Sequence, residues 1–561
     1  MLTKIKFAPG IDKQDTAVGA EGRWVDSDNV RFRYGLPEKV GGWQSLLTDT
    51  LVGVARKQHA FVDQDGNRYV AIGTDKFLII YFEGQFFDVT PLATAISGAT
   101  FTFNNTTTVT LTTSAAHNIS VGDIIRLTGT TLPGGTTGVT TATFDDTNFQ
   151  VLSVPTSTTL TIQAATAGSA SSGGSVTINP FEVVGPAAQS YGYGYGVGNY
   201  AGTITGASQS TLDGALAADT NGNNGSATQI RLASTTGFPS SGGTIAVGSE
   251  LITYTGVAGA ELTGISRAQK GTSSAIHSTS ATVTNATEFT GWGDAVDAGT
   301  ITLEPGLWSL SNFGDVLVAT IGNGKTFTWD SSIAARLSTR ASTTTSGFQT
   351  TNNPTATRTT LISPTTRHLI HFGTETTIGN PTTQDDMFIR FSEDENINAY
   401  VPEATNTAGT QRIQDGTKIV GALVAKENIL VWTDNALYTM KFVGAPFTFG
   451  FEQVGTNCGL IGKNAAVEVD GAAYWMSDNG FFRYTGKLES MDCLVEDYVY
   501  DNLNTTSNQF IYCGINNLFG EITWFYPEAD SNVNTQSVTY SYLDSTAKRP
   551  IWFVNASPLF I

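Results

Sequence analysis

The chain has 561 residues, which is enough for several domains of about 100–200 residues each. Only 14% of the residues are charged, 60 are glycine, and the formal net charge is −19 at pH 7. A Gly- and Thr-rich composition with few charges is typical of all-β proteins, because Thr fits a pleated sheet and Gly permits tight turns. The acidic balance argues against a basic nucleic-acid-binding face, since such a face needs Lys and Arg to neutralise phosphates.

The first 95 residues are rich in aromatic and charged side chains. Within them, the segment VDQDGNRYVAIGTDKFLIIYFEGQFFDVTPL (62–92) contains three short apolar runs separated by D-G, T-D and E-G turns. Turns of this kind between apolar runs are typical of antiparallel hairpins. We therefore predict that residues 1–95 comprise an N-terminal docking segment followed by the first strands of a larger β body.

The stretch RFRYGLPEKVGGW (31–43) concentrates arginines and aromatic residues near the N-terminus. Arg and Trp are enriched among the residues that anchor protein interfaces. We predict an interface that includes Trp24, Arg31, Arg33 and Trp43. The alternative interpretation is a strand that caps the chain's own β body.

Two modules with a different amino-acid composition follow. Residues 96–180 carry only four charged side chains and alternate Thr with apolar residues, which predicts a small all-β module, a sandwich or a barrel. Residues 181–221 are rich in Gly, Tyr and Ser and include the run YGYGYG, which is typical of a linker. Shorter alternating runs predict a second β module over residues 222–286.

After residue 287 the sequence is again rich in aromatic residues, as in residues 1–95. An apolar run enters a turn such as N-G, D-N-A or D-N-G, and a second run carrying Trp, Phe or Tyr follows, in the segments 311–330, 423–444, 467–486 and 519–530. Successive hairpins without helical periodicity are typical of β-propeller blades. We predict an all-β fold with a discontinuous β-propeller-like body, whose remaining blades span 287–561, and with both modules inserted into an early blade. A sandwich built from the same hairpins is the alternative.

Three short motifs resemble functional loops, but the context argues against each. ATIGNGKT (319–326) fits a relaxed P-loop pattern, yet the strand-like FTWD follows where a phosphate-binding loop needs a helix. DQDGN (63–67) lacks the later Glu and the helices of a calcium loop, so a D-G hairpin turn explains it. SEDEN (392–396) places adjacent acids in one loop, an arrangement that does not aim two carboxylates at one substrate.

The histidines and cysteines form no metal or catalytic pattern. Only His368 and His371 are close in sequence, and side chains three residues apart on a strand point to opposite faces. Cys458, Cys493 and Cys513 are odd in number and include no CxxC pair, which favours buried free thiols. No nucleophile elbow and no HExxH motif occurs. We therefore expect no catalytic residue, no metal and no cofactor.

The N-terminal sequence MLTKIKFAPG has no apolar core of a secretory signal, and no run of about 18 apolar residues occurs. We expect synthesis in the cytoplasm and no membrane span.

Two stretches resemble virion structural proteins of short-tailed bacteriophages, often called tail nozzle, tail tubular protein B or stabilisation proteins. The first is FAPGIDKQDTAVGAEGRWVDSDNVRFRYGLPEKVGGW (7–43), chiefly through Gly10-Ile11, EGRWVDSDNVRFR and GLPEKVGGW. The second is IRFSEDENINAYVPE (389–403), where Phe391 and Tyr400 stand at positions often taken by Trp. Phrases of the modules, such as AHNISVGDIIRLTG and LTGISRAQKGTSSAIHS, are similar to accessory β modules of virion proteins.

The resemblance implies a ring of copies of this chain, commonly a hexamer, around a channel through which genomic DNA passes without specific binding. It also implies docking to portal or adaptor proteins, attachment of tail fibres or spikes, and a place in the tail of the virion. We therefore expect a structural protein rather than an enzyme. Two other classes of function stay open, a glycan- or receptor-binding tail spike and a propeller-type glycan hydrolase.

Overall fold

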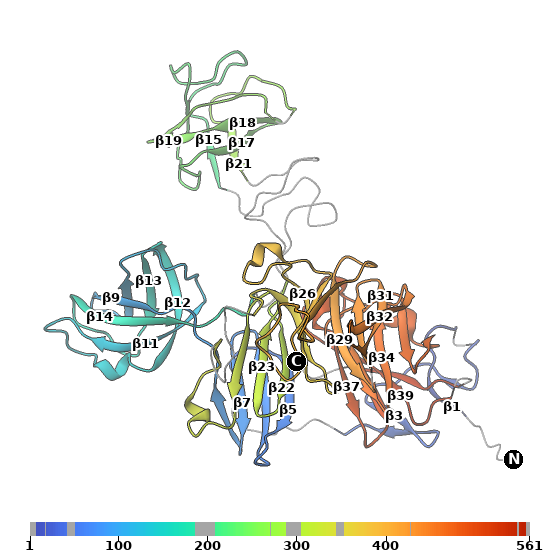
Figure 1. Cartoon of the computed structure of the whole chain (residues 1–561). Helices are drawn as coiled ribbons and strands as arrows, with labels where there is room; N and C mark the ends of the chain where they lie inside the picture. The colour runs from blue at the N-terminus through green and yellow to red at the C-terminus, as the bar shows by residue number, and fades with distance from the viewer. Residues whose placement is uncertain are drawn as a thin grey trace. The chain divides into compact units, whose positions relative to one another are not determined.

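The computed structural model describes residues 7–16, 18–41, 51–185, 208–269, 271–287, 304–343, 353–426, 428–546 and 549–556 (Figure 1). Regular structure in these ranges is almost entirely β, which confirms the predicted all-β class. Helical structure there is limited to α1 (Glu496–Asp501) and short 3-10 turns at Thr141–Thr143, Arg336–Ser338, Pro381–Thr383 and Thr505–Phe510. The chain divides into two units, Met1–Ala188 with Glu304–Ile561, and Gln189–Leu303. No helix in the described ranges is long and apolar enough to cross a bilayer.

Six antiparallel sheets, numbered blades 1 to 6, follow one another in the larger unit, and each is built from strands consecutive in sequence. Blade 1 contains β5 (Ala55–Val62), β6 (Arg68–Thr74), β7 (Leu78–Phe82) and β8 (Gln85–Asp88). Blade 2 contains β22 (Trp308–Phe313), β23 (Val316–Ile321) and β24 (Thr326–Asp330), and blade 3 contains β25 (Thr357–Ile362), β26 (Leu369–Thr374), β27 (Phe388–Phe391) and β28 (Gly409–Arg412). Blade 4 contains β29 (Ile419–Ala425), β30 (Asn428–Thr433), β31 (Ala436–Gly444) and β32 (Thr448–Thr456). Blade 5 contains β33 (Ala466–Val469), β34 (Ala472–Ser477), β35 (Gly480–Tyr484) and β36 (Leu488–Ser490), and blade 6 contains β37 (Tyr512–Asn516), β38 (Glu521–Tyr526), β39 (Gln536–Ser541) and β40 (Trp552–Ala556).

The first strands of the six blades are neighbours in blade order. β5 contacts β22, β22 contacts β25, and the series continues through β29 and β33 to β37. The segment that leads into blade 6 then meets blade 1, because the Arg56 guanidinium lies 4.0 Å from the centre of the Phe510 ring. At the same place Lys57 Nζ donates to Asn464 Oδ1 at 2.9 Å. The blades therefore close into a propeller-like ring, although both inserted modules separate blade 1 from blade 2 in the sequence.

Buried tryptophans tie neighbouring blades together. Trp308 Nε1 of blade 2 donates to Thr74 O of blade 1 at 2.8 Å, and Trp524 Nε1 of blade 6 donates to Ala465 O, just before blade 5, at 2.9 Å. Both side chains are fully buried. An indole combines a large apolar body with one donor, which finds a backbone acceptor when the ring is buried. The aromatic residues of the hairpin pattern thus form packing surfaces between blades.

A closed six-stranded barrel follows blade 1 in the sequence. Its strands lie in the order β10-β13-β12-β11-β14-β9. They are β9 (Ile96–Phe103), β10 (Thr108–Thr112), β11 (Ile124–Thr131), β12 (Thr147–Thr156), β13 (Thr159–Gln163) and β14 (Ser171–Pro180). The inward residues of the Thr-apolar alternation fill it, among them Phe101, Leu111 and Ile162. The barrel runs from Ile96 in β9 to Pro180 in β14.

The second module contains two small sheets. One holds β15 (Gln209–Thr211), β21 (Thr282–Asn285), β17 (Gly243–Val247) and β18 (Glu250–Tyr254), and the other holds β16 (Ile230–Arg231), β20 (Glu261–Thr263) and β19 (Gly256–Ala258). The predicted boundaries, a linker over 181–221 and a module over 222–286, are wrong at their junction. β15 pairs with β21, and Leu212 and Leu216 belong to the module's core, so residues 208–221 are part of the module. The sequence of β15 is polar and lacks the apolar alternation that predicts a strand, so the strand is not recognisable from the sequence. Residues 186–207, with the YGYGYG run, lie outside the described residues.

Gly73 in β6 makes room for the Trp308 ring, since a Cβ at this position would lie 2.4 Å from Trp308 Cδ1. We predict that Gly73→Ala destabilises the protein by about 1–3 kcal/mol, because the added methyl group overpacks the contact between blades 1 and 2. Thermal unfolding of the full chain measures the effect. Gly514→Ala in β37 is the matched control, because its Cβ would meet no neighbour closer than 3.7 Å. Equal melting temperatures for the two variants would contradict this packing.

Candidate functional site

The N-terminal segment packs on the last strand of blade 6. In this segment β1 (Ala8–Ile11) pairs with β2 (Arg23–Trp24), and β3 (Val30–Arg33) pairs with β4 (Leu36–Lys39). Val30 N donates to Asn555 Oδ1 at 3.3 Å, and Ala556 N donates to Asp28 Oδ1 at 3.0 Å. β40 is the terminal strand of its sheet, so these contacts cover an edge that would otherwise present unpaired backbone groups. We call residues 7–41 the N-terminal strap.

Arg31 is a buried anchor of the N-terminal strap. Its Nε lies 3.0 Å from Glu521 Oε1 in β38, and its guanidinium carbon lies 3.5 Å from the centre of the Phe519 ring. Burial raises the pKa of Glu521, while the charge of Arg31 acts in the opposite direction. This geometry agrees with the alternative interpretation of the segment as a strand that caps the chain's own body.

The other predicted interface residues take different positions. Trp24 is partly buried against the apolar core that includes blade 6. Arg33 is half-buried, with its guanidinium carbon 5.2 Å from the centre of the Phe519 ring. Trp43 lies outside the described residues. A role of these residues in contact with another molecule stays a prediction.

Exposed apolar side chains lie around the turn between β3 and β4. Tyr34 and Leu36 are 81% and 68% exposed, and Leu518 and Leu543 in loops of blade 6 are 76% and 64% exposed. Tyr34 N donates to Asp544 Oδ2 at 3.2 Å, which places the turn beside one of these loops. We call these four apolar residues the apolar patch. Sequence analysis missed Leu518 and Leu543, because nothing in their local pattern distinguishes them from ordinary hairpin residues.

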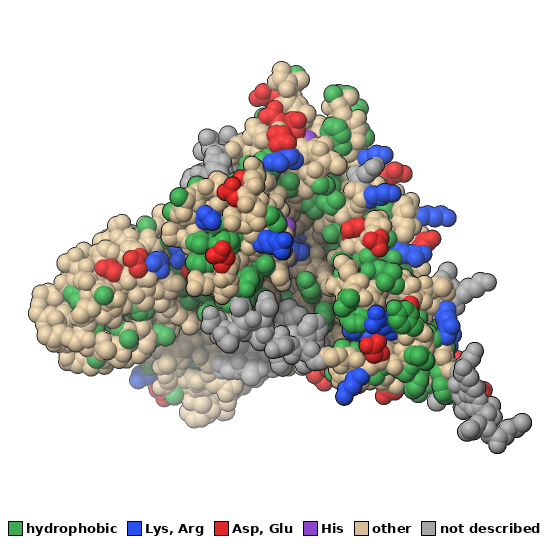
Figure 2. All heavy atoms as spheres, turned by 90° about the horizontal axis from the view of Figure 1, so that it is seen from below, with side chains coloured by type: hydrophobic (Ala, Val, Ile, Leu, Met, Phe, Trp, Pro, Cys, Tyr) green, Lys and Arg blue, Asp and Glu red, His purple; other side chains and the backbone are tan. Residues whose placement is uncertain are grey.

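A polar cavity of about 200 Å³ lies where the first strands of the blades converge. Figure 2 shows a hollow between the blades from below, with Lys and Arg side chains at its edge. Arg358 Nη2 and Lys418 Nζ clamp the two carboxylate oxygens of Glu304, at 2.6 and 2.9 Å. Burial raises the pKa of Glu304, but the two cations outweigh it and lower that pKa overall. The three residues come from blade 3, the start of blade 4 and the segment before blade 2, so the cavity is assembled from distant parts of the sequence.

Two further lysines contribute to the same region without a carboxylate partner. Lys463 Nζ donates to Arg358 O at 3.0 Å, and Lys57 Nζ donates to Asn464 Oδ1 at 2.9 Å. Burial, followed by the charges of Lys57 and Arg358, lowers the pKa of Lys463 to about 7. Burial also lowers the pKa of Lys57. In the part of the chain that the structure describes, neither lysine makes an ion pair.

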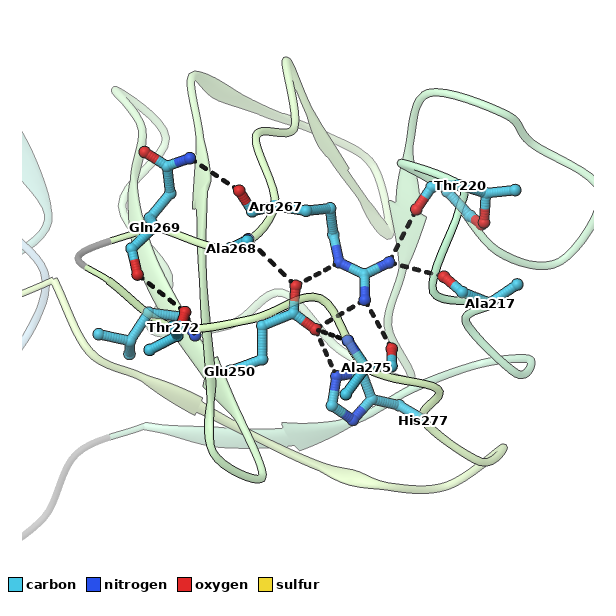
Figure 3. Close-up of polar contacts among 11 residues, drawn as sticks. Ala217, Thr220, Glu250, Arg267, Ala268, Gln269, Thr272, Ala275 and His277 are labelled. Carbon is cyan, nitrogen blue, oxygen red and sulfur yellow. Dashed lines mark hydrogen bonds and ion pairs between the residues drawn. The ribbon is translucent and has the colours of Figure 1, made fainter.

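The second module contains a buried ionic cluster around Glu250 (Figure 3). Arg267 donates to both carboxylate oxygens of Glu250 at 2.6 Å, and His277 Nε2 lies 2.8 Å from Oε2. The backbone N–H groups of Ala268 and Ala275 donate to the same carboxylate at 3.2 and 3.1 Å. Burial acts to raise the pKa of Glu250, but these hydrogen bonds outweigh it and lower the pKa to about 2. The cluster joins β18 to Arg267, Ala268, Ala275 and His277, with both oxygens of the carboxylate engaged.

The quoted motif LTGISRAQKGTSSAIHS contains Arg267 and His277, but no pattern in the sequence connects them with Glu250. A signal was available, because Glu250 occupies the inward phase of β18 together with Ile252 and Tyr254. An acid at an inward strand position requires a partner. Which residues supply the partners depends on the path of the 267–277 loop, and that path has no local pattern.

The three motifs set aside in the sequence are structural. ATIGNGKT forms the hairpin between β23 and β24, with Lys325 paired to Glu182 at 2.8 Å. DQDGN is the turn between β5 and β6, where Asp63 Oδ1 accepts from Asn67 N at 2.7 Å. In SEDEN, Glu393 Oε2 accepts from Asn396 Nδ2 at 3.1 Å, so this acid is engaged within its own loop.

The buried histidine of blade 3 also has neighbours within the fold. His371 Nε2 lies 3.1 Å from Tyr400 Oη, and Nδ1 lies 3.0 Å from Thr357 Oγ1. Burial, with a smaller contribution from Arg390, lowers the pKa of His371 to about 3. The three cysteines are free and buried. No group of three or more His, Cys, Asp or Glu side chains in the described ranges is arranged to hold a metal ion.

Comparisons with known proteins assign the chain to no family. No family model matches it, and no curated protein sequence matches it. Among solved structures, it is similar to apo AztD from Citrobacter koseri at 8% identity over 82% of this chain and 98% of that chain, with a TM-score of 0.24. The extracellular domain of the one component system BT4673 from B. thetaiotaomicron matches at 10% identity over 94% and 78%, with a TM-score of 0.21. The phage phi92 endosialidase matches at 9% identity over 89% and 56%, with a TM-score of 0.15. TM-scores this low assign neither a fold family nor a function.

Acid is predicted to open the second module before the pH reaches 2. The depressed pKa of Glu250 stabilises the folded module above about pH 4.5, and this contribution of roughly 3 kcal/mol is lost as the pH falls from about 4.5 towards 2. Hydrogen exchange of the full chain between pH 6 and pH 3 measures it, after correction for the intrinsic exchange rates. Protection in 250–277 should fall more steeply with pH in the native chain than in Glu250→Gln, while Glu261→Gln should behave like the native chain. Parallel profiles for all three would contradict the assignment.

Arg31→Met is predicted to release the N-terminal strap, because it leaves Glu521 buried without its cation. Removing one partner of a buried ion pair costs about 3–5 kcal/mol. Limited proteolysis with mass spectrometry should show earlier cleavage within residues 7–41. Arg23→Met, at a more exposed ion pair, is the control, and adding Glu521→Gln to Arg31→Met should restore part of the resistance. Unchanged cleavage in Arg31→Met would show that this pair does not hold the strap.

Proposed function

We propose that this chain is a structural protein of the tail of a short-tailed bacteriophage, a nozzle or tail-tube protein that forms a ring around the DNA exit channel. The observation that carries the proposal is the N-terminal segment 7–43, which resembles the corresponding segment of such virion proteins. In its described part, the N-terminal strap, Arg31 pairs with Glu521 and packs against the Phe519 ring. Charged and aromatic residues that pack within the fold are expected of a structural protein that assembles with others.

The second resembling stretch, 389–403, supports the same class of function. Tyr400 is buried and lies within hydrogen-bond distance of His371, and Glu393 is engaged by Asn396. Asp394 accepts from Thr407 and Glu395 pairs with Arg367, so the three acids of SEDEN each contact a different partner. A glycan hydrolase would need two carboxylates that converge on one bond.

The apolar patch offers a surface for assembly. Grouped exposed apolar side chains are typical of protein interaction sites. In the proposed ring, the patch contacts a neighbouring copy, and portal or adaptor proteins dock on one face while fibres or spikes attach at another. The cavity of about 200 Å³ is far too small for a DNA duplex, so the channel of the proposed ring lies between copies of the chain. The net charge of −19 suits a wall that DNA passes without binding.

Gold labelling of intact particles tests the proposal, with antibodies to residues 1–95 and, separately, to residues 96–286. We expect label at the distal tail of DNA-filled particles. Label confined to fibres would instead favour the receptor-binding spike, and label on the capsid surface or only on soluble protein would overturn the nozzle assignment.

The proposed ring of several copies of the chain is tested on the purified full chain by analytical ultracentrifugation over a range of protein concentrations. We expect a closed oligomer that Leu518→Ser with Leu543→Ser dissociates. Val121→Ser, a 63% exposed apolar residue of the barrel module, is the matched control and should leave the oligomer intact. Equal behaviour of both variants would exclude the apolar patch as the contact between copies.

A further inference from the structure

Within the described residues, the basic groups at the centre of the ring of blades are only partly neutralised by carboxylates. Glu304 is shared by Arg358 and Lys418, and Arg358 also lies 3.4 Å from Asp386. Lys57 and Lys463, by contrast, donate to a neutral amide oxygen and a backbone carbonyl. A lysine ammonium carries three N–H donors, and each of these contacts uses one of them. Both lysines therefore keep donors for a further acceptor.

Burial disfavours the charged form of both lysines, and an anion beside them offsets that cost. Both are half-buried, and the charge of Lys57 lowers the pKa of Lys463 further, so the two ammonium groups lie close enough to repel each other. Like charges in a region of low dielectric repel more strongly than in water. The cavity that Lys463 lines and the adjoining hollow that Lys57 lines share Leu307 and Gln509. Space for a small ligand thus exists beside both ammonium groups.

We propose that the cavity at the centre of the ring of six blades binds a small free oxyanion, of the phosphate or carboxylate kind. This ion accepts hydrogen bonds from Lys463 and Lys57. The volume of about 200 Å³ admits such an ion and excludes a nucleic-acid duplex. An anion there compensates two lysines that form no ion pair with any described residue, and it connects blade 1 to the segment that leads into blade 5. The site does not depend on the proposed role in a virion.

Binding is expected to weaken at high pH. Lys463 has a pKa of about 7, so its ammonium form predominates at pH 6 and its neutral form at pH 9. The neutral amine retains less attraction for an anion, and anion binding near pH 7 should take up a proton. The charged groups that face Lys463 from the surrounding elements are Lys57, Glu304, Arg358 and Lys418, and the carboxylates of Asp434 and Asp478 line the same cavity.

Calorimetry and thermal unfolding of the full chain with inorganic phosphate test the proposal, with sodium chloride keeping the ionic strength constant. We expect saturable binding at pH 6 that raises the melting temperature with phosphate concentration and weakens at pH 9. Lys463→Met should weaken binding by about 10- to 100-fold, as expected when a hydrogen bond to a charged group is lost. Lys441→Met, at an exposed lysine of β31, should bind like the native chain.

Lys463→Met removes a half-buried charge that another cation repels, so the variant is expected to fold and to melt no lower than the native chain without phosphate. Lys57→Met is the second variant and should weaken phosphate binding in the same direction. The proposal is overturned if phosphate adds nothing beyond matched chloride. It is equally overturned if Lys463→Met and Lys57→Met bind phosphate as tightly as Lys441→Met.

Discussion

The ring of blades depends on how its two ends meet, and one buried amide makes that junction. Asn464 Oδ1 accepts from Lys57 Nζ at 2.9 Å, its Nδ2 donates to Arg56 O at 3.3 Å, and its backbone oxygen accepts from Cys513 N at 2.9 Å. The residue that leads into blade 5 therefore holds blade 6 and blade 1 together. This matters because both modules are inserted between blade 1 and blade 2, so these two neighbouring blades are far apart in the sequence.

Buried and half-buried ion pairs join separate parts of this chain. Only 14% of its residues are charged, yet ion pairs hold the N-terminal strap at Arg31, the second module at Glu250 and the centre of the ring at Glu304. A buried ion pair adds little net stability, but losing one partner is costly, so such pairs select one arrangement of strands over others. The unpaired lysines at the centre are the exception to this pattern, and the proposed oxyanion gives them the partner that the described chain lacks. A body with few charges, whose parts are joined by defined ion pairs, also suits the proposed place in a tail assembly.

The sequence indicated the all-β class and the propeller-like body, because hairpin turns and strand alternation are local patterns; for residues 96–180 it predicted a β module and left open whether this is a sandwich or a barrel. The strand-like sequence that follows residues 319–326 also excluded a P-loop at that position. The sequence did not indicate the start of the second module, because β15 is short and polar. The partner of Arg31 could not be predicted either, since Glu521 lies near the other end of the chain. The same holds for the central cavity, whose residues come from strands that only ring closure brings together.

A double-mutant cycle between Lys57 and Asn464 tests the closure of the ring most directly. The free energy of unfolding is measured by urea denaturation for the native chain, Lys57→Met, Asn464→Ala and the double variant. If the two side chains join blade 1 to the rest of the ring, the losses are non-additive, with a coupling of about 1.5–3 kcal/mol, as for other hydrogen bonds to charged groups. Losses that add to within about 0.5 kcal/mol would show that the two residues do not interact and would contradict the account of how the ring closes.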